Sequence, residues 1–288
     1  MTLAAACFQT LRYMFQKQLA ARTLSAAGAT FARFLYSAPL IAVGLAAYVF
    51  VSGQSLPLPP PAFWAFCMTG GVAQITATIC VVRLFQMRNF GVGIALMKTE
   101  VILSVLVGLL LLGEGVSLRA FAAILLGLCG VLLLSAQPRG RVLNAGMALG
   151  LASGALFALS AVSYRGATLN VAAADPWLRA GTTLSAVTMM QLLGMAVWLW
   201  AAQPGQIAAV WAARRKALWI GLLSMAGSLG WFTAFSLQTA AYVKAIGQIE
   251  LVLSLIASAV FFREKSTLKE LTGMAILCAA ILALLWVV

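Results

Sequence analysis

Long apolar stretches follow one another along nearly the whole chain, separated by short polar or proline-containing breaks. A helix needs roughly 20 apolar residues to cross a hydrocarbon core about 30 Å thick. The stretches are continuous rather than alternating, so they predict helices and exclude a transmembrane barrel. We expect about ten membrane-spanning helices, over residues 2–20, 28–52, 62–87, 90–112, 118–136, 145–165, 177–201, 217–238, 241–262 and 268–288.

Composition supports this all-α, multi-pass membrane protein. Hydrophobic residues make up 63% of the 288 residues and charged residues only 9%, whereas charged residues are about a quarter of a soluble domain. The net charge of +13 would suggest nucleic acid in a soluble protein. Here most basic residues fall in the breaks, where they orient the chain and meet anionic head groups, so we expect the bilayer and no nucleic acid as partner.

Several classes of chemistry lack the residues they need. The chain has no histidine, which removes imidazole ligands and the commonest general base. None of its five cysteines forms a CxxC pair, and no P-loop is present. We therefore expect no enzyme activity, no catalytic residues, no metal site, no cofactor and no direct use of ATP.

The two halves of the chain resemble each other. Shifted by 150 residues, KTEVILSVLVGLLLLGEGVSL (98–118) aligns without a gap with QIELVLSLIASAVFFREKSTL (248–268). Glu100 then meets Glu250, and Glu114 meets Glu264. Two rare carboxylates at one separation indicate a duplication, with repeats at residues 1–137 and 141–288. Five helices in each half force the second copy to enter the membrane upside down, and inverted repeats are typical of transporters.

The segments LGEGVSLRAFAAILLGLCGVLLL and FREKSTLKELTGMAILCAAILALL also resemble the ends of two EamA-type domains of the drug/metabolite transporter superfamily. The opening FQTLRYMFQKQLAARTLSAAGATFARFLYSAPL is similar to the first two helices of that family, including the step Arg33-Phe34. The resemblance implies secondary transport. The family's usual proline after the acidic residue is replaced by Val101 and Leu251, so the sequence gives no proline-based reason for a helix break there.

Two arguments on orientation conflict. One set of breaks carries eleven basic residues and the other set only Arg119, Arg165 and Arg179. The positive-inside rule then places both termini outside. The family resemblance implies cytoplasmic termini, so orientation stays open.

Glu100 and Glu250 are predicted near the centres of the fourth and ninth helices, where an ionisable group costs about 2.5–3.5 kcal/mol and needs a partner or a wet cavity. Each carboxylate either binds a cation, proton or substrate ammonium, or forms a structural ion pair. Lys98 and Lys244 fall on other faces of those helices, so we expect no pairing within one helix. Each reaches another helix or extends to the interface, and the interface is favoured for Lys244.

Gln9, Arg12 and Gln16 form one polar stripe on the first helix, and Arg33 and Tyr36 a similar face on the second. A guanidinium there would hold a carboxylate or phosphate, or these groups satisfy each other. Hydrogen-bonding and stacking surfaces are expected from four further candidates, Gln74, Tyr164, Trp231 and Gln248. Among deep positions the basic residues outnumber the two glutamates; they are Arg12, Arg33, Arg83, Lys98 and Lys244.

Two further patterns are interpreted as structural. Gly146, Gly150 and Gly154 allow close helix packing, which we assign to contacts within the monomer rather than to a dimer. Glu114 and Glu264 lie at helix ends among basic residues, where a cap or ion pair is favoured.

The sequence therefore predicts a secondary transporter in the cytoplasmic membrane that moves an anionic or zwitterionic metabolite, such as an amino acid or organic acid, by alternating access. We expect export, with proton coupling and uncoupled exchange as open alternatives. A monomer suffices, although a homodimer is an alternative. The rival function is a flippase or scramblase of an anionic lipid head group, which a positive interior would also suit.

Overall fold

The computed structural model describes residues 1–20, 24–87, 97–135, 145–261 and 267–287, and helices are the only regular elements among them. The first half contains α1 (Thr2–Ala20), α2 (Ala26–Ser52), α3 (Pro61–Met87), the 3₁₀ turn η1 (Met97–Thr99), α5 (Glu100–Leu112) and α6 (Leu118–Ser135). The second half contains α7 (Ala145–Leu169), α8 (Pro176–Ala202), α9 (Gln206–Ala212), α10 (Arg214–Leu237), α11 (Ala240–Ile246), α12 (Ile249–Phe261) and α13 (Leu268–Val287).

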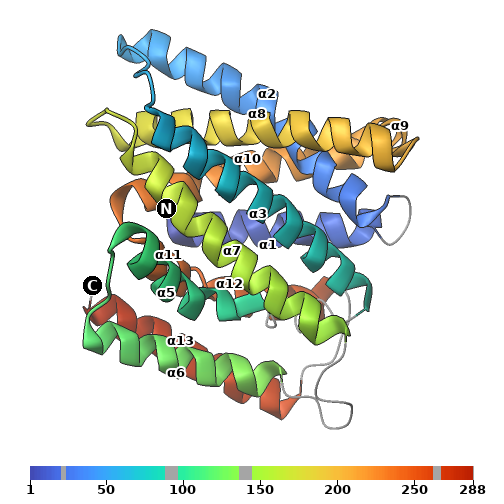
Figure 1. The fold of residues 1–288 in the computed structure, drawn as a ribbon. Coiled ribbons are helices and arrows are strands. Elements are labelled where there is room, and N and C mark those ends of the chain that lie inside the picture. Colours follow the sequence, from blue (N-terminus) through green and yellow to red (C-terminus); the bar gives the residue numbers. More distant parts are fainter. Residues whose placement is uncertain (21–23, 88–96, 136–144, 262–266, 288) are drawn as a thin grey trace.

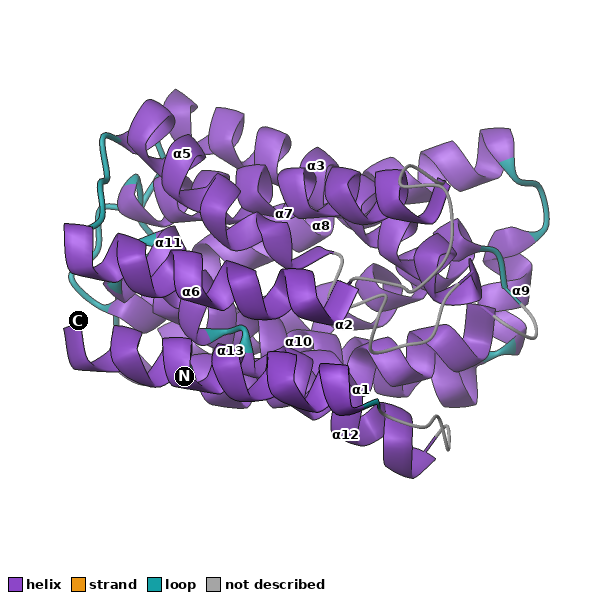
Figure 2. Ribbon diagram, turned by 90° about the horizontal axis from the view of Figure 1, so that it is seen from below, coloured by secondary structure: helices purple, strands orange, loops and turns teal. Residues whose placement is uncertain are grey.

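Among the described residues, five helices are long and apolar enough to cross a membrane: α2, α3, α7, α8 and α10. They confirm a multi-pass membrane protein. The other predicted spans correspond to helices that are shorter, carry more charge or extend beyond the described residues, so the ten-span architecture stays a prediction. Both termini lie at the same end of the elongated bundle (Figures 1 and 2), as an even number of spans requires.

The main helix pairs each join one helix from the first half to one from the second. α1 packs along α10, α3 along α7 and α2 along α8. At the lower edge of Figure 1, α6 and α13 lie side by side, and α5 contacts α11. The two halves are therefore interleaved, and the core lies between them.

The predicted ninth helix is interrupted, which corrects the expectation of a continuous span over residues 241–262. α11 ends at Ile246 and α12 begins at Ile249. At this break the N–H groups of Gln248, Glu250 and Leu251 donate to the carbonyl oxygens three residues earlier, at 3.2, 3.0 and 2.8 Å, which is a 3₁₀ pattern. No proline is needed for this break. At Gly247 a Cβ would collide with the Trp231 indole, so glycine permits the close approach of α10.

The two glutamates consequently lie at helix starts and not at helix centres. Glu100 is the first residue of α5 and follows the 3₁₀ turn η1, and Glu250 is the second residue of α12. Residues 88–96, where the predicted fourth span begins, lie outside the described residues. A carboxylate in the first turn of a helix is favoured by the unpaired N–H groups and the helix dipole.

Local capping fixes one end of the bundle around Asp175. Its carboxylate caps α8 by accepting the Trp177 N–H at 2.9 Å, with Pro176 as the first helical residue. The Tyr48 hydroxyl near the end of α2 donates to the same carboxylate at 2.6 Å. This hydrogen bond and the cap hold the pKa of Asp175 below its ordinary value. The contact joins α2 to α8 at the bundle surface.

Gly154 brings α7 close to the turn that precedes α5. A Cβ at this position would collide with the Thr99 hydroxyl and lie 2.9 Å from the Met97 carbonyl oxygen. For Gly154, packing within the chain is therefore confirmed. The residues it contacts flank Lys98, so this glycine helps to set the position of the charged turn.

We predict that Gly154→Ala destabilises the fold by about 1–3 kcal/mol, because the methyl group must displace the backbone of η1. Thermal unfolding of the purified protein in detergent measures the effect. Gly194→Ala in α8 is the matched control, since a Cβ at that position would extend into open space. Equal unfolding midpoints for the two variants would contradict the close contact.

Candidate functional site

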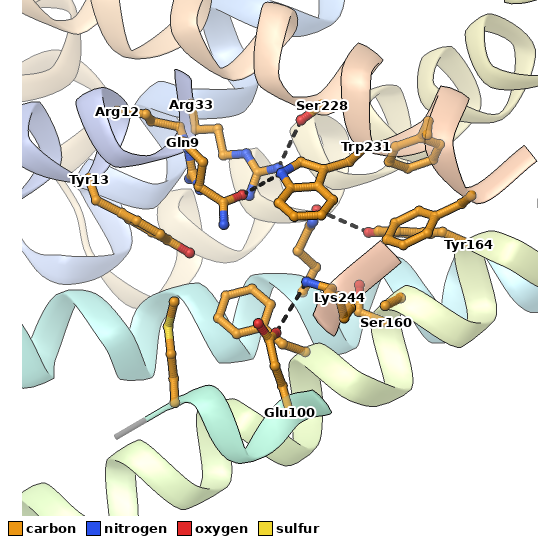
Figure 3. Close-up of a pocket in the computed structure, with 16 residues that line it drawn as sticks. Gln9, Arg12, Tyr13, Arg33, Glu100, Ser160, Tyr164, Ser228, Trp231 and Lys244 are labelled. Carbon is orange, nitrogen blue, oxygen red and sulfur yellow. Dashed lines mark hydrogen bonds and ion pairs between the residues drawn. The ribbon is translucent and has the colours of Figure 1, made fainter. Parts of the chain in front are cut away.

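A small buried pocket lies where α1, α2, α3, α5, α7, α10 and α11 converge (Figure 3). Its cavity volume is about 30 Å³, which is room for roughly two water molecules. A solute of amino-acid size enters this conformation only if side chains or helices move apart. Both polar and aromatic side chains line the pocket.

Two crossed ion pairs lie at the pocket, with Glu100 and Lys244 in its lining and Lys98 and Glu250 behind them. Lys98 Nζ lies 2.6 Å from Glu250 Oε2, and Lys244 Nζ lies 3.1 Å from Glu100 Oε2. Each pair joins the segment η1–α5 to the segment α11–α12. All four residues are at most 9% exposed. Lys98 Nζ also lies 3.6 Å from Glu100 Oε1, so the four groups form one neutral cluster.

These contacts correct two expectations about the lysines. Lys244 does not extend to the interface, because α11 directs it inward to Glu100, over the rings of Trp231 and Phe157 at 5.0 and 5.6 Å. Lys98 does contact the glutamate of its own segment, because the 3₁₀ turn rotates it from the position that a regular helix would give. Its shorter contact is with Glu250 on another helix, and contact with another helix was one of the two alternatives that the sequence left open.

A chain of neutral donors completes the coordination of Glu250. Trp231 Nε1 donates to Gln9 Oε1 at 3.0 Å, and Gln9 Nε2 donates to both oxygens of Glu250 at 3.0 and 3.1 Å. A buried carboxylate costs several kcal/mol unless its lone pairs are satisfied. Both carboxylate oxygens of Glu250 therefore accept hydrogen bonds, from Lys98 and Gln9.

The pocket's two arginines have neutral partners. Arg33 Nε donates to Ser224 at 2.8 Å and Arg33 Nη2 to Ser228 at 3.2 Å, while its Nη1 is buried without a hydrogen-bond partner among the described residues. Arg12 Nη1 donates to Gln16 Oε1 at 3.1 Å, and its guanidinium lies 4.3 Å from the Tyr13 ring centroid. Within the described part of the chain, no carboxylate forms an ion pair with either arginine.

Amide and phenol groups form a second hydrogen-bond network at the pocket. The Tyr164 hydroxyl donates to Gln74 Oε1 at 3.0 Å, and Gln191 Nε2 donates to the same oxygen at 3.0 Å. The Tyr164 ring lies 4.6 Å from the Phe232 ring, centroid to centroid. Phe232 and Phe235 of α10 continue this aromatic wall beside Trp231.

The structure brings most of the predicted site residues to this pocket. Eight line it: Gln9, Arg12, Arg33, Gln74, Glu100, Tyr164, Trp231 and Lys244. Lys98, Glu250 and Gln16 lie directly behind and hold lining residues through the contacts above. Tyr36 and Gln248 lie elsewhere, because Tyr36 packs against Gly221 of α10 and Gln248 approaches Gly127 of α6. Whether any of these residues binds a substrate stays a prediction.

Sequence reasoning missed several lining residues, among them Tyr13, Met97, Phe157, Ser160, Ser228, Phe232 and Phe235. One signal was available on α10, where Ser224, Ser228, Trp231 and Phe235 recur every three or four residues on one helix face. Tyr13, Met97 and Phe157 carry no such signal, because an aromatic residue or methionine in an apolar helix is not distinguished from core.

Arg83 differs from expectation, whereas Glu114 agrees with it. Arg83 of α3 is exposed on the bundle surface and so adds no charge to the pocket. Glu114 forms an ion pair, as favoured, but its partner is Arg165 of α7 at 3.0 Å, and Arg165 also donates to the Phe235 carbonyl at 2.7 Å. Glu264 lies outside the described residues.

We predict strong coupling between Lys98 and Glu250. Either Lys98→Met or Glu250→Gln leaves a buried charge without its partner, which typically costs about 3–5 kcal/mol, whereas the double variant removes both charges and recovers part of that loss. Unfolding of the four proteins in detergent completes the double-mutant cycle. The half-buried pair Glu114–Arg165 serves as a comparison with weaker coupling. Additive losses at Lys98 and Glu250 would contradict the ion pair.

Comparisons with known proteins agree with this architecture. Residues 1–136 match the model of the EamA-like transporter family. A solved structure titled "Crystal structure of protein" is similar over 99% of this chain and 99% of its own, with a TM-score of 0.65 and 16% sequence identity, which shows a shared fold. No curated protein matches the sequence.

Proposed function

We propose that the whole chain is a secondary transporter of a small anionic or zwitterionic metabolite. The premise is that the chain belongs, through residues 1–136, to the EamA-like transporter family, which is part of the drug/metabolite transporter superfamily. The observation that carries the proposal is the buried, charged pocket at the junction of helices from both halves. Charged side chains inside a membrane protein are costly and mark substrate or ion pathways.

The proposal includes two inverted five-helix repeats, over residues 1–137 and 141–288. The pairing of helices supports it, because the pairs are reciprocal under exchange of the halves. α1, the first long helix of the first half, packs on α10, the third long helix of the second half, and α7 packs on α3 in the same way. The remaining spans pair with their equivalents: α2 with α8, the fourth spans through α5 and α11, and α6 with α13. The crossed pairs Lys98–Glu250 and Lys244–Glu100 follow this exchange at the glutamates only, because Lys98 aligns with Gln248 and not with Lys244.

Alternating access then has a physical basis in the ion-pair cluster. The cavity is too small for a metabolite in this conformation, so transport requires the helices around it to separate. The cluster joins the segments η1–α5 and α11–α12 across the two halves, and movement between those segments must break or exchange its contacts. Protonation of Glu100 or Glu250 would weaken the cluster, which gives proton coupling a route; uncoupled exchange needs none. Export across the cytoplasmic membrane is the proposed direction.

The test is flux through purified protein in proteoliposomes. Uptake and efflux of labelled amino acids and organic acids are measured with and without a pH gradient, for wild type, Glu100→Gln and Glu250→Gln. We expect saturable flux, and loss of gradient dependence in the variant that removes a coupling carboxylate. Arg83→Gln is the matched control, since Arg83 is exposed and lies outside the pocket.

Lipid movement is followed in the same vesicles. A solute transporter leaves the asymmetry of a labelled anionic lipid unchanged. Lipid movement without flux of any solute would refute the proposal and favour a lipid flippase or scramblase.

A further inference from the structure

The charges around the pocket separate into a balanced group and an unbalanced group. Lys98 and Lys244 are balanced by Glu250 and Glu100 within one cluster. Arg12 and Arg33 are left, and both line the pocket. With all six groups charged, the pocket therefore carries two uncompensated positive charges in a site shielded from water.

Arg33 also offers a specific contact atom. Its side chain is 4% exposed and is held by Ser224 and Ser228 on α10, which fix the plane of the guanidinium. Its Nη1 lacks a partner among the described residues although it is buried. An unsatisfied buried donor is costly, and the cost is larger for a charged group. A ligand carboxylate would accept a hydrogen bond from Arg33 Nη1 and would also neutralise the charge of the guanidinium.

The carboxylates at the pocket already interact with lysines. Glu250 accepts from Lys98 and Gln9, while Glu100 Oε2 accepts from Lys244 and Glu100 Oε1 lies 3.6 Å from Lys98 Nζ. Gln74 Oε1 already accepts from Tyr164 and Gln191, and the Trp231 ring already faces Lys244. An ammonium group at either glutamate would have to compete with a lysine for the carboxylate, and a displaced lysine would be left buried and unpaired.

The rest of the ligand meets a mostly aromatic wall. The pocket is lined by Phe157, Tyr164, Trp231, Phe232 and Phe235, and three of these residues lie on α10, which also carries the serines that hold Arg33. Aromatic side chains favour flat, apolar groups through stacking and edge-to-face contacts. A ligand with one anionic end and one flat apolar end therefore matches this lining once the helices around the pocket separate.

From this geometry we infer that the pocket is selective for organic monocarboxylates that carry no ammonium group, with the carboxylate on Arg33 and the apolar body against the α10 aromatic wall. The inference rests on the proposed function and narrows its substrate class, because it favours organic acids over amino acids. Arg12 contributes charge, and Arg33 supplies the direct hydrogen bond.

Four ligands with the same phenylalkyl body test the inference: 3-phenylpropanoate, phenylalanine, phenethylamine and 3-phenylpropanamide. Their binding to the full-length protein in detergent is measured by isothermal titration calorimetry at pH 7. We expect 3-phenylpropanoate to bind at least about tenfold more tightly than phenylalanine, because the ammonium group of phenylalanine would have to compete with a lysine for a carboxylate. The cation and the amide should bind more weakly still.

Variants assign the contact to Arg33. Arg33→Gln should weaken 3-phenylpropanoate binding by about tenfold to one-hundredfold, the usual effect of losing a charged hydrogen bond. Arg33→Lys, which keeps the charge without the planar fork, should lose less, and Arg83→Gln should bind as wild type does. The ligand series in the wild type needs no substitution, so it decides the question even if Arg33→Gln fails to fold.

Equal or tighter binding of phenylalanine or phenethylamine would overturn the inference, and so would unchanged 3-phenylpropanoate binding in a folded Arg33→Gln. Absence of binding by all four ligands would also overturn it, while saturable flux of another solute in proteoliposomes would leave the transporter proposal standing. Selective binding of 3-phenylpropanoate without flux of any solute would instead support the site and refute transport.

Discussion

The crossed contact between two lysines and two glutamates is the constraint on which the centre of this protein depends. Each of the four charges would cost several kcal/mol if buried alone, and each finds its partner on the other half of the chain. The halves must therefore approach closely at this point. Gly154 permits that approach, while Gly247 lets Trp231 of its own half pack at the break. The 3₁₀ turns before Glu100 and Glu250 direct the side chains inward.

The neutrality of this cluster gives the arginines their significance. Counting charges alone, four basic groups and two acidic groups surround the pocket, and any of the basic groups is a candidate for an anion. Once Lys98 and Lys244 are engaged, the excess belongs to Arg12 and Arg33. Ser224, Ser228 and Gln16 hold these guanidinium groups without neutralising them. A positive site thus lies beside a cluster whose contacts are sensitive to movement of the halves.

The family match and the likeness of fold cover different parts of this picture. The sequence is recognisable as EamA-like over its first half, whereas the likeness to a solved structure extends over nearly the entire chain at 16% identity. Apolar helices preserve a fold while their residues change, because packing tolerates exchange among aliphatic side chains of similar volume. Functional chemistry must therefore be argued from the polar residues of this chain and not from the fold.

The sequence by itself determined where the helices lie. The boundaries of α1, α3 and α6 agree with the predicted ranges within a residue, because apolar stretches bounded by proline and polar residues are a local property of the chain. It also singled out Glu100 and Glu250, since a rare carboxylate in an apolar stretch is visible without a structure. The polar stripe of Gln9, Arg12 and Gln16 was likewise readable from helical spacing.

Only the tertiary structure decided which charges meet. Lys244 pairs with Glu100 and Glu114 with Arg165 because helices distant in sequence come together, and no local pattern encodes that choice. The exposure of Arg83 and the burial of Arg33 depend on the same packing, as does the break at Gly247, where Trp231 from another helix occupies the space of a side chain. Hydropathy is set by neighbours along the chain, whereas the partner of a charge is set by neighbours in space.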